Sequence, residues 1–285
     1  MLLNDYQQRI ADYYRDTENA YKDSWDLNNS LSIHYGYWDD KVRSFPQSLI
    51  RMNEIMAEAA TIKAGDYVLD AGCGVGGSSI FLAKNIGAKV MGITLSQRQA
   101  EQANKNAVTN GVENSVQFEL RNYSDTGLLA NSFDVTWGCE SICYAENKEQ
   151  FIREAFRLLR PGGRLVVADG FVTDFKNNEN LIIRKWLDGW QVNYLETPER
   201  FLEYAKNAGF RDMSYRDISK ATVHSSRRLY KVYYLAKMYL LWKKINFSKP
   251  ATLMQKKNIE ACKYQFIGMK TKLWQYGLFT AVKPG

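Results

Sequence analysis

A glycine-rich turn between an apolar strand and a helix is the feature that most constrains how this chain folds. The expected strand over residues 67–70 ends in Asp70, and the turn Asp70-Ala-Gly72-Cys-Gly74-Val-Gly76-Gly77 leads into a helix expected over 78–85. Glycines let backbone N–H groups approach a ligand closely, and the N-terminus of the following helix favours negative groups. The order of strand, glycine turn and helix therefore predicts a nucleotide-binding turn.

Short apolar runs alternate with helical stretches through the middle of the chain, which predicts βαβ units around a parallel sheet. The expected fold class is α/β: a Rossmann-like, doubly wound, mostly parallel seven-stranded sheet with an N-terminal helical segment and a helical cap inserted before the last strand. The expected strands cover residues 67–70, 89–94, 116–120, 133–137, 164–168, 213–218 and 278–282. The expected helices cover 4–30, 45–60, 78–85, 96–109, 148–159 and 197–207, and a basic, aromatic helical insertion covers 222–272.

The composition is that of an ordinary globular protein. Of 285 residues, 45% are hydrophobic and 24% charged, which excludes collagen, a coiled coil and a disordered tail. The apolar run over 229–242 is interrupted by lysines, so no transmembrane helix is expected, and the N-terminus has no signal-peptide pattern. Four scattered cysteines without a CxxC pair predict no metal site and a cytoplasmic protein.

The charge is distributed unevenly along the chain. Residues 211–285 carry 16 Lys and Arg against 3 acidic residues, a net charge of +13, so residues 1–210 carry −6. An anionic substrate, an anionic membrane surface or nucleic acid would each explain the basic block. The simpler interpretation is a solvated helix face whose lysines extend over apolar neighbours.

Two details distinguish the glycine turn from a dinucleotide-binding fingerprint. Asp70 ends the strand before the glycines, and a carboxylate there suits a ligand with an amine or a sulfonium better than a pyrophosphate. The second strand continues into Gly92-Ile-Thr94-Leu-Ser-Gln-Arg-Gln99, so it lacks the acidic residue expected for a dinucleotide ribose. The turn therefore favours a different, positively charged nucleoside ligand.

Four stretches resemble the class I methyltransferases that use S-adenosylmethionine. They are Val68-Leu-Asp-Ala-Gly-Cys-Gly, Gly92-Ile-Thr-Leu-Ser, Phe133-Asp-Val and Leu159-Arg-Pro-Gly-Gly-Arg-Leu, which follow the family's order and spacing and cover residues 65–170. The Thr-Leu-Ser-x-x-Gln stretch is similar to the subgroup that includes sterol, γ-tocopherol, geranyl diphosphate and cyclopropane fatty-acid enzymes.

This resemblance implies S-adenosyl-L-methionine as the cofactor and a set of residues that contact it. Ribose contacts are implied for Thr94, Leu95 and Gln99, although a solvated helix residue is the alternative for Gln99. The remaining implied contacts are Asn122 and Tyr123 beside the adenine, Tyr35, Gly72 and Cys139 around the methionine moiety, and Asp70, Cys73 and Gly74 in the turn. A small core residue is the alternative interpretation of Cys139.

The expected fourth strand ends in Gly138-Cys-Glu140-Ser-Ile-Cys-Tyr144-Ala, at the edge of the sheet where ligands bind in such folds. This segment resembles the sterol and geranyl diphosphate C-methyltransferases. The resemblance implies that Glu140 takes a proton and that the ring of Tyr144 stabilises a cation. The alternative for Glu140 is a carboxylate that binds loop backbone or the cofactor amine. His34 and His224 are expected to be structural or exposed.

Aromatic residues occur before the expected core and again after its fifth strand. Tyr37 and Trp38 precede it, and Trp186, Trp190 and Tyr194 follow the fifth strand at spacings of four, which predicts one helix face. We expect these five residues to contact an apolar acceptor. An ordinary amphipathic core face is the alternative.

These inferences together predict three regions and one enzyme class. Residues 1–60 are expected to form a lid over the cofactor, 61–221 and 273–285 the core, and 222–272 a cap over the acceptor site. The expected function is methyl transfer to a lipophilic isoprenoid, sterol-like or polyketide-like molecule, preferentially at carbon. The alternatives are O- or N-methylation of a secondary metabolite, methylation of nucleic acid, and a catalytically silent binding protein. The lysines of 222–272 are expected to meet an anionic membrane surface or a diphosphate.

Overall fold

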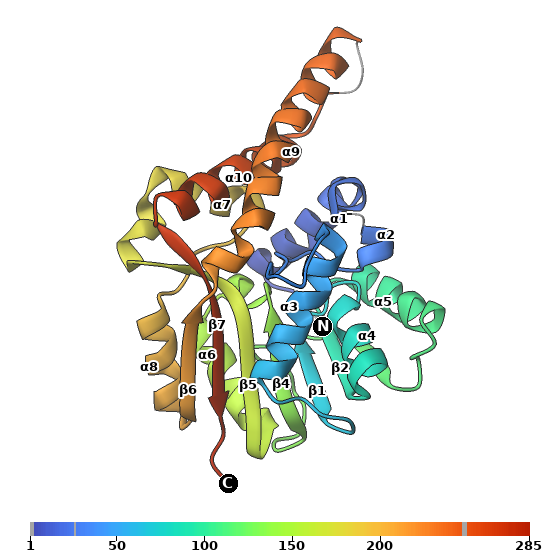
Figure 1. Ribbon diagram of the computed structural model, residues 1–285, viewed down its shortest axis with the longest axis vertical. Helices are drawn as coiled ribbons and strands as arrows, with labels where there is room; N and C mark the ends of the chain where they lie inside the picture. The colour runs from blue at the N-terminus through green and yellow to red at the C-terminus, as the bar shows by residue number, and fades with distance from the viewer. Residues whose placement is uncertain (1–2, 26, 247–249) are drawn as a thin grey trace.

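The computed structural model describes residues 3–25, 27–246 and 250–285. In this part of the chain seven strands form one sheet in the order β3-β2-β1-β4-β5-β7-β6 (Figure 1). The first five strands are parallel, and β7 runs antiparallel to both of its neighbours. The strands are β1 (Tyr67–Ala71), β2 (Lys89–Thr94), β3 (Val116–Leu120), β4 (Phe133–Cys139), β5 (Leu159–Val172), β6 (Arg211–Asp217) and β7 (Trp274–Val282). The predicted fold class is confirmed.

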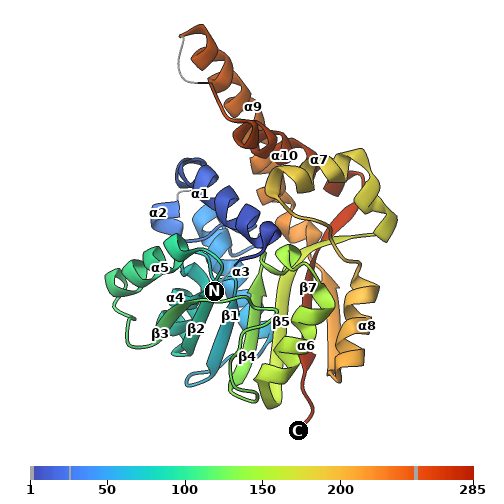
Figure 2. The ribbon, with the colours of Figure 1, turned by 180° about the vertical axis from the view of Figure 1, so that it is seen from behind.

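Helices cover both faces of the sheet, and the alternation of side chains along each strand explains why both faces are apolar. Val68 of β1 belongs to a core cluster with Met52 of α3, whereas the next residue, Leu69, belongs to a second cluster with Phe151 of α6. Accordingly, α3 covers the face seen in Figure 1, and α6 covers the face seen in Figure 2. The helices on and around the sheet are α3 (Phe45–Ala59), α4 (Gly77–Phe81), α5 (Gln97–Thr109), α6 (Lys148–Leu158) and α8 (Pro198–Ala208).

Four of these helices, α3, α5, α6 and α8, begin at a side-chain cap. Ser96 before α5 accepts a hydrogen bond from the Gln99 backbone N–H, and Asn147 before α6 does the same for Gln150. The helix predicted over 78–85 is present, as α4 over Gly77–Phe81 continued by a π-helical turn over Leu82–Ile86. Left-handed Gly87 ends that turn.

The strands beside the cap are longer than the apolar runs suggest. The β5–β7 pairing extends from Arg164↔Val282 to Val172↔Trp274, beyond the body of the sheet. The extension carries aromatic and polar residues as well as apolar ones. The strands expected over 164–168 and 278–282 are therefore shorter than the observed β5 and β7.

Helices from three parts of the chain gather above the carboxyl ends of the parallel strands. The N-terminal helix predicted over 4–30 corresponds to α1 (Asp5–Trp25) and α2 (Leu27–Ser30), and the predicted insertion over 222–272 is a hairpin of α9 (Ser219–Ile245) and α10 (Leu253–Lys270). The third part is α7 (Leu181–Trp190), which packs closely on α10: a Cβ at Gly189 would lie 2.4 Å from the Lys257 carbonyl oxygen. Beyond this junction α9 projects away from the body (Figures 1 and 2). None of the described helices is both long enough and apolar enough to span a membrane.

Candidate functional site

The glycine turn forms a cavity at the carboxyl ends of β1, β2 and β4, which we call the turn cavity. Gly72 and Gly74 adopt φ values of 94° and 54°, in the left-handed region that favours glycine. Asp70 lies buried beneath them, where its carboxylate accepts a hydrogen bond of 2.6 Å from Ser79 Oγ. Burial raises the pKa of Asp70 to about 6. A positively charged ligand group would favour the ionised form of this carboxyl.

Most of the residues predicted to contact the cofactor line this turn cavity. Thr94 Oγ1 donates a hydrogen bond of 2.8 Å to Gln99 Oε1, and within the described part of the chain no acceptor takes the N–H groups of the Gln99 amide. The Tyr123 hydroxyl donates to the Ser141 carbonyl at 2.8 Å. The predicted residues that line the cavity are Asp70, Gly72, Cys73, Gly74, Thr94, Leu95, Gln99, Tyr123 and Cys139. Two others lie elsewhere: Asn122 accepts from the Ser124 backbone N–H, and Tyr35 lines the neighbouring cavity.

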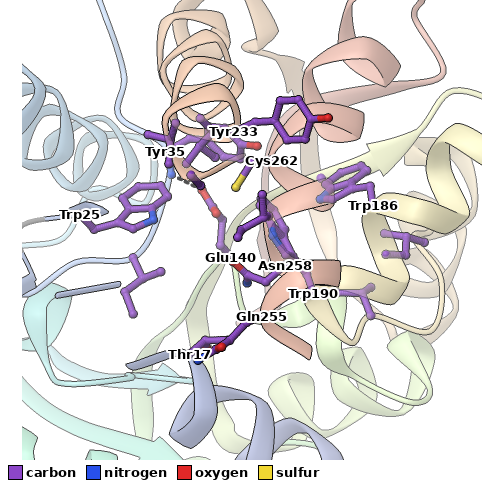
Figure 3. Close-up of a pocket in the computed structure, with 18 of the residues that line it drawn as sticks. Thr17, Trp25, Tyr35, Glu140, Trp186, Trp190, Tyr233, Gln255, Asn258 and Cys262 are labelled. Atoms are coloured by element: carbon purple, nitrogen blue, oxygen red, sulfur yellow. Dashed lines mark hydrogen bonds between the residues drawn. The ribbon is translucent and has the colours of Figure 1, made fainter. Parts of the chain in front are cut away.

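A larger cavity, which we call the aromatic cavity, lies between the sheet and the helices above it. Its volume is about 510 Å³, within the range of small-molecule sites. Figure 3 shows Trp25, Trp186 and Trp190 around it, contributed by α1 and α7, with Tyr233 from α9 and Cys262 from α10. Helices that are distant in sequence therefore supply one apolar wall.

The two cavities meet at four residues that line both of them: Tyr14, Ile33, Glu140 and Tyr144. Glu140 and Tyr144 are the two residues whose catalytic roles the resemblance implies. Glu140 follows β4 with φ 48°, an unusual backbone conformation for a residue with a side chain. This conformation places its carboxyl group at the boundary between the cavities.

The Glu140 carboxyl is held by two hydrogen bonds to one of its oxygens. Oε1 accepts from the Tyr276 hydroxyl at 2.7 Å and from the Tyr35 backbone N–H. Among the described residues, no hydrogen bond reaches Oε2. Removal from water is the main cause that raises the pKa of Glu140 to about 8. The group is therefore positioned by its neighbours and still has an oxygen to accept a proton.

A second carboxyl group, Asp169 of β5, lines the aromatic cavity and was missed in the sequence. Asp169 Oδ2 accepts from the Cys143 backbone N–H at 2.9 Å, and Oδ1 accepts from the Gly170 backbone N–H at 2.7 Å. Burial raises its pKa. The signal that identified Asp70, an acidic residue at the end of an apolar run, occurs again at Asp169 directly after residues 164–168.

Comparison with known proteins decides the family. A family model described as a methyltransferase domain matches residues 69–167. Methyltransferase GfsG from Streptomyces halstedii is 34% identical over 170 residues, which are 59% of this chain and 60% of that protein. The O-methyltransferase resE from Aspergillus sclerotiorum is 30% identical over 191 residues, 65% of this chain and 71% of that protein. The chain belongs to the S-adenosylmethionine-dependent methyltransferases.

Further similarities agree with the predicted subgroup. Tocopherol and sterol methyltransferases are among the relatives of this methyltransferase. A solved geranyl diphosphate methyltransferase, in complex with GPP and sinefungin, superposes with a TM-score of 0.77 over 99% of this chain and all of that one, at 19% identity. That identity establishes the shared fold. The family, the enzyme class and S-adenosyl-L-methionine as cofactor are thus confirmed, although the chain spans only 60% of the length of GfsG.

The turn cavity of the methyltransferase fits this cofactor. A Cβ added at Gly74 would meet nothing within 4 Å, so open space lies beside the backbone of the turn. The cavity, about 100 Å³ in volume, adjoins a groove of about 710 Å³ along α5, and Val75, Ser96 and Gln99 line both. Backbone N–H groups, a carboxyl and an amide are the groups that a nucleoside with an amino-acid tail needs. Asp70, Thr94 and Gln99 would hold it.

Three residues predicted to contact the acceptor lie outside the aromatic cavity. Trp38 Nε1 donates to Ser225 Oγ at 3.2 Å, and Tyr37 packs against the core, so both fasten the N-terminal segment to the methyltransferase. The prediction of one helix face for Trp186, Trp190 and Tyr194 was wrong for Tyr194, because α7 ends at Trp190 and Gln191 is left-handed.

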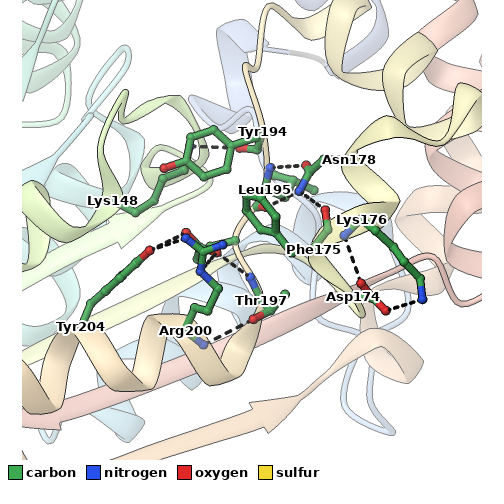
Figure 4. A network of polar contacts seen from close by, with 11 residues as sticks. Lys148, Asp174, Phe175, Lys176, Asn178, Tyr194, Leu195, Thr197, Arg200 and Tyr204 are labelled. Carbon is green, nitrogen blue, oxygen red and sulfur yellow. Dashed lines mark hydrogen bonds and ion pairs between the residues drawn. The ribbon is translucent and has the colours of Figure 1, made fainter.

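Tyr194 instead belongs to a polar network beneath the cavity (Figure 4). Lys148 Nζ lies 3.7 Å from the centroid of the Tyr194 ring and donates to the carbonyls of Cys143, Ala145 and Tyr194 at 2.8–3.0 Å. Burial lowers the pKa of this lysine to about 8. Lys148 thereby ties the segment that carries Cys143 and Tyr144 to the chain after α7.

Neither histidine lines the aromatic cavity, although His34 lines the turn cavity. His34 is buried with its Nδ1 3.0 Å from the Tyr35 carbonyl oxygen, and burial lowers its pKa to about 4. His224 lies on α9, and its ring packs against the ring of Trp38 with the two centroids 5.4 Å apart. Glu140 and Asp169 are the acidic residues that line the aromatic cavity.

Proposed function

We propose that this methyltransferase transfers a methyl group from S-adenosyl-L-methionine to a lipophilic small molecule bound in the aromatic cavity, with carbon as the acceptor atom. The observation that carries the proposal is the position of Glu140 and Tyr144 at the junction of the two cavities. In this proposal residues 1–60 act as a lid over the cofactor and residues 222–272 as a cap over the acceptor.

The walls of the aromatic cavity support an acceptor of isoprenoid, sterol-like or polyketide-like character. Trp186 and Trp190 pack edge to face with their centroids 5.6 Å apart, and Tyr233 and Leu229 add further apolar surface from α9. At the floor, Glu140 and Asp169 place two carboxyl groups beside the reacting end of the molecule. These groups favour a neutral reacting end, or one that becomes positive, over an anionic one.

The chemistry divides between the cofactor and the protein. The cofactor supplies an electrophilic methyl group on a sulfonium sulfur. An alkene or electron-rich ring carbon would form a bond to this methyl while the S–CH₃ bond breaks and its electron pair stays on sulfur. The acceptor would then be cationic and would have to lose a proton. Glu140 Oε2 accepts that proton, and the faces of Tyr144 and the surrounding aromatic residues stabilise the positive charge before it is lost. The cavity walls exclude water, which would otherwise capture the cation.

The hydrogen bonds of Glu140 support this role. Tyr276 and the Tyr35 backbone fix Oε1, so the carboxyl does not rotate away from the junction. In the ligand-free protein its pKa of about 8 keeps the group largely protonated at neutral pH. A sulfonium beside Glu140 would lower this pKa, because a positive charge favours the carboxylate. The base would then be ionised when the cofactor is bound.

Oxygen is the second candidate for the acceptor atom, because the relative resE is named as an O-methyltransferase. A phenol or alcohol would use the same two cavities, and Glu140 would take the hydroxyl proton as the O–CH₃ bond forms. Such a reaction creates no carbocation, so it makes less use of the aromatic walls.

The experiment that tests the proposal uses ¹³C-methyl-labelled S-adenosyl-L-methionine with a panel of prenylated phenols, sterols and polyketide alcohols. The ¹³C chemical shift of the product separates C–CH₃ from O–CH₃. Glu140→Gln should retain cofactor binding and lose product formation by about 10²-fold or more. Glu146→Gln, an exposed change in the same loop, is the matched control. Unchanged turnover of the Glu140 variant would remove Glu140 as the base.

The proposal also includes a peripheral contact with an anionic membrane through residues 222–272. An acceptor of this class dissolves in lipid rather than in water, and residues 222–272 carry 10 lysines and 2 arginines against 1 acidic residue.

A further inference from the structure

The distal half of α9 has an apolar face that no described residue covers. The buried residues of α9 end at Leu229, and beyond them the helix leaves the body of the protein (Figure 1). The large apolar side chains Leu235, Met238, Leu241, Trp242 and Ile245 of α9, with Leu253 of α10, are 56–71% exposed. Spacings of three and four place the α9 residues on one side of the helix. We call residues 234–246 and 250–257 the tip.

The opposite side of the same helix lines the aromatic cavity. Val232, Ala236 and Leu240 face the cavity, as does the half-buried Lys243. Tyr239 belongs to both surfaces, because it lines the cavity and is also 56% exposed. The aromatic cavity therefore extends along α9 as far as the exposed apolar face. On this side, α9 lies between the cavity and the surroundings.

Lysines border the apolar face. Lys244 lies exposed between Trp242 and Ile245 on α9, and Lys256 and Lys257 lie exposed near the start of α10, after the exposed Leu253. Lys237 forms an ion pair of 3.2 Å with Glu260, the one acidic residue of the described part of α10. An apolar helix face bordered by lysines is typical of a helix that lies in the interface of an anionic membrane.

We propose that the tip inserts into the surface of an anionic bilayer and that the acceptor enters the aromatic cavity from the lipid along α9. The route rests on the proposed methyl transfer and the docking develops the proposed membrane contact, which does not depend on methyl transfer. A second copy of this chain suits the tip less well. A symmetric contact would place the same face on itself and bring Lys244 of each copy close to the other.

Flotation with vesicles tests the docking without cofactor or acceptor. The full chain is mixed with phosphatidylcholine vesicles that contain phosphatidylglycerol, and with vesicles of phosphatidylcholine alone. We expect binding to the anionic vesicles that weakens with salt. Met238→Ser/Trp242→Ser should weaken it by at least tenfold, and Lys244→Glu/Lys257→Glu by a similar factor, since each lysine near an anionic surface contributes about fivefold.

The matched control is Val108→Ser/Leu129→Ser, which removes two apolar side chains of similar exposure from the core domain. This control should bind as the wild type does, and all variants should unfold at the same temperature, because the changed side chains are exposed. Quenching of Trp242 fluorescence by brominated acyl chains, absent in Trp242→Phe, would place the tip in the bilayer.

Several results would overturn the docking. These are failure of the wild type to bind anionic vesicles, equal binding of the tip variant and its control, and a concentration-dependent dimer that only the tip variant abolishes. Cofactor affinity, measured separately by calorimetry, distinguishes this failure from a failure of the proposed function. A chain that binds vesicles and cofactor but transfers no methyl group would retain the docking and contradict the proposed function.

Discussion

The position of Glu140 predicts an unusual dependence of stability on pH. Its pKa is about 8 in the folded chain and near 4.5 when unfolded. Between these two values the folded state holds a proton that the unfolded state has released. The free energy of unfolding therefore falls as pH rises through this window, by about 1 kcal/mol per pH unit. Glu140→Gln cannot titrate, so its stability should not share this decline.

The structure also gives the expected behaviour at the acidic end. In the Glu140→Gln variant the new side-chain amide oxygen can accept the hydrogen bonds that Tyr276 and the Tyr35 backbone donate to Glu140 Oε1. Below pH 4.5 the folded and unfolded states of both proteins carry no charge at this position. We therefore expect wild type and variant to be similar in stability near pH 5, and the variant to be more stable at pH 8 by several kcal/mol at most.

Thermal unfolding of the ligand-free protein, followed by circular dichroism from pH 5 to pH 9, measures this difference. For a chain of this size, 1 kcal/mol corresponds to roughly 2 °C in Tm. The Tm of the variant should rise steadily relative to that of the wild type as pH rises. Asp70 and Asp169 also have raised pKa values, but they are present in both proteins and largely cancel. Parallel Tm curves across the range would refute the assignment of a buried, protonated carboxyl at the junction.

Three further variants separate cofactor binding, acceptor binding and positioning. Gly74→Ala and its control Gly111→Ala both place a side chain at positive φ in open space, so calorimetry should find similar losses of stability. Only Gly74→Ala should weaken the binding of S-adenosyl-L-methionine. Equal affinities of the two variants would argue against the turn cavity as the cofactor site. Trp190→Ala should raise the acceptor KM about tenfold or more and leave cofactor affinity unchanged, since it removes one wall of the aromatic cavity alone; a change confined to the cofactor would contradict this division. Lys148→Met leaves three carbonyls without their donor, so it should lower both Tm and kcat while cofactor affinity persists; an unchanged kcat would show that Lys148 does not position the Tyr144 segment.

The sequence predicts the sheet and the turn cavity well because both depend on local patterns. A strand that ends in Asp70 and glycines with positive φ leave a signature within eight residues, and Ser96 marks the start of α5. The location of the segment after β4 was equally predictable, since the carboxyl end of a parallel strand determines where Glu140 and Tyr144 lie.

The aromatic cavity was less predictable from the sequence, because contacts between residues far apart in the chain form it. Tyr276 reaches Glu140 across 136 positions, and Gln265 accepts from the Tyr35 hydroxyl across 230. No local period reports such contacts. Spacing alone also misplaced Tyr194, because the left-handed Gln191 ends α7 three residues before Tyr194. Helix propensity did not reveal the projecting half of α9.

The central claim is that this chain methylates a lipophilic molecule at the junction of its two cavities. The most direct measurement incubates the protein and methyl-labelled S-adenosyl-L-methionine with a lipid extract of the source cells, then separates organic, aqueous and acid-precipitable fractions for mass spectrometry. The account predicts label in the organic fraction, in a product one methylene heavier than its precursor, and none with Glu140→Gln. Label confined to the aqueous or acid-precipitable fraction, or no transfer by a protein that binds the cofactor, would contradict it.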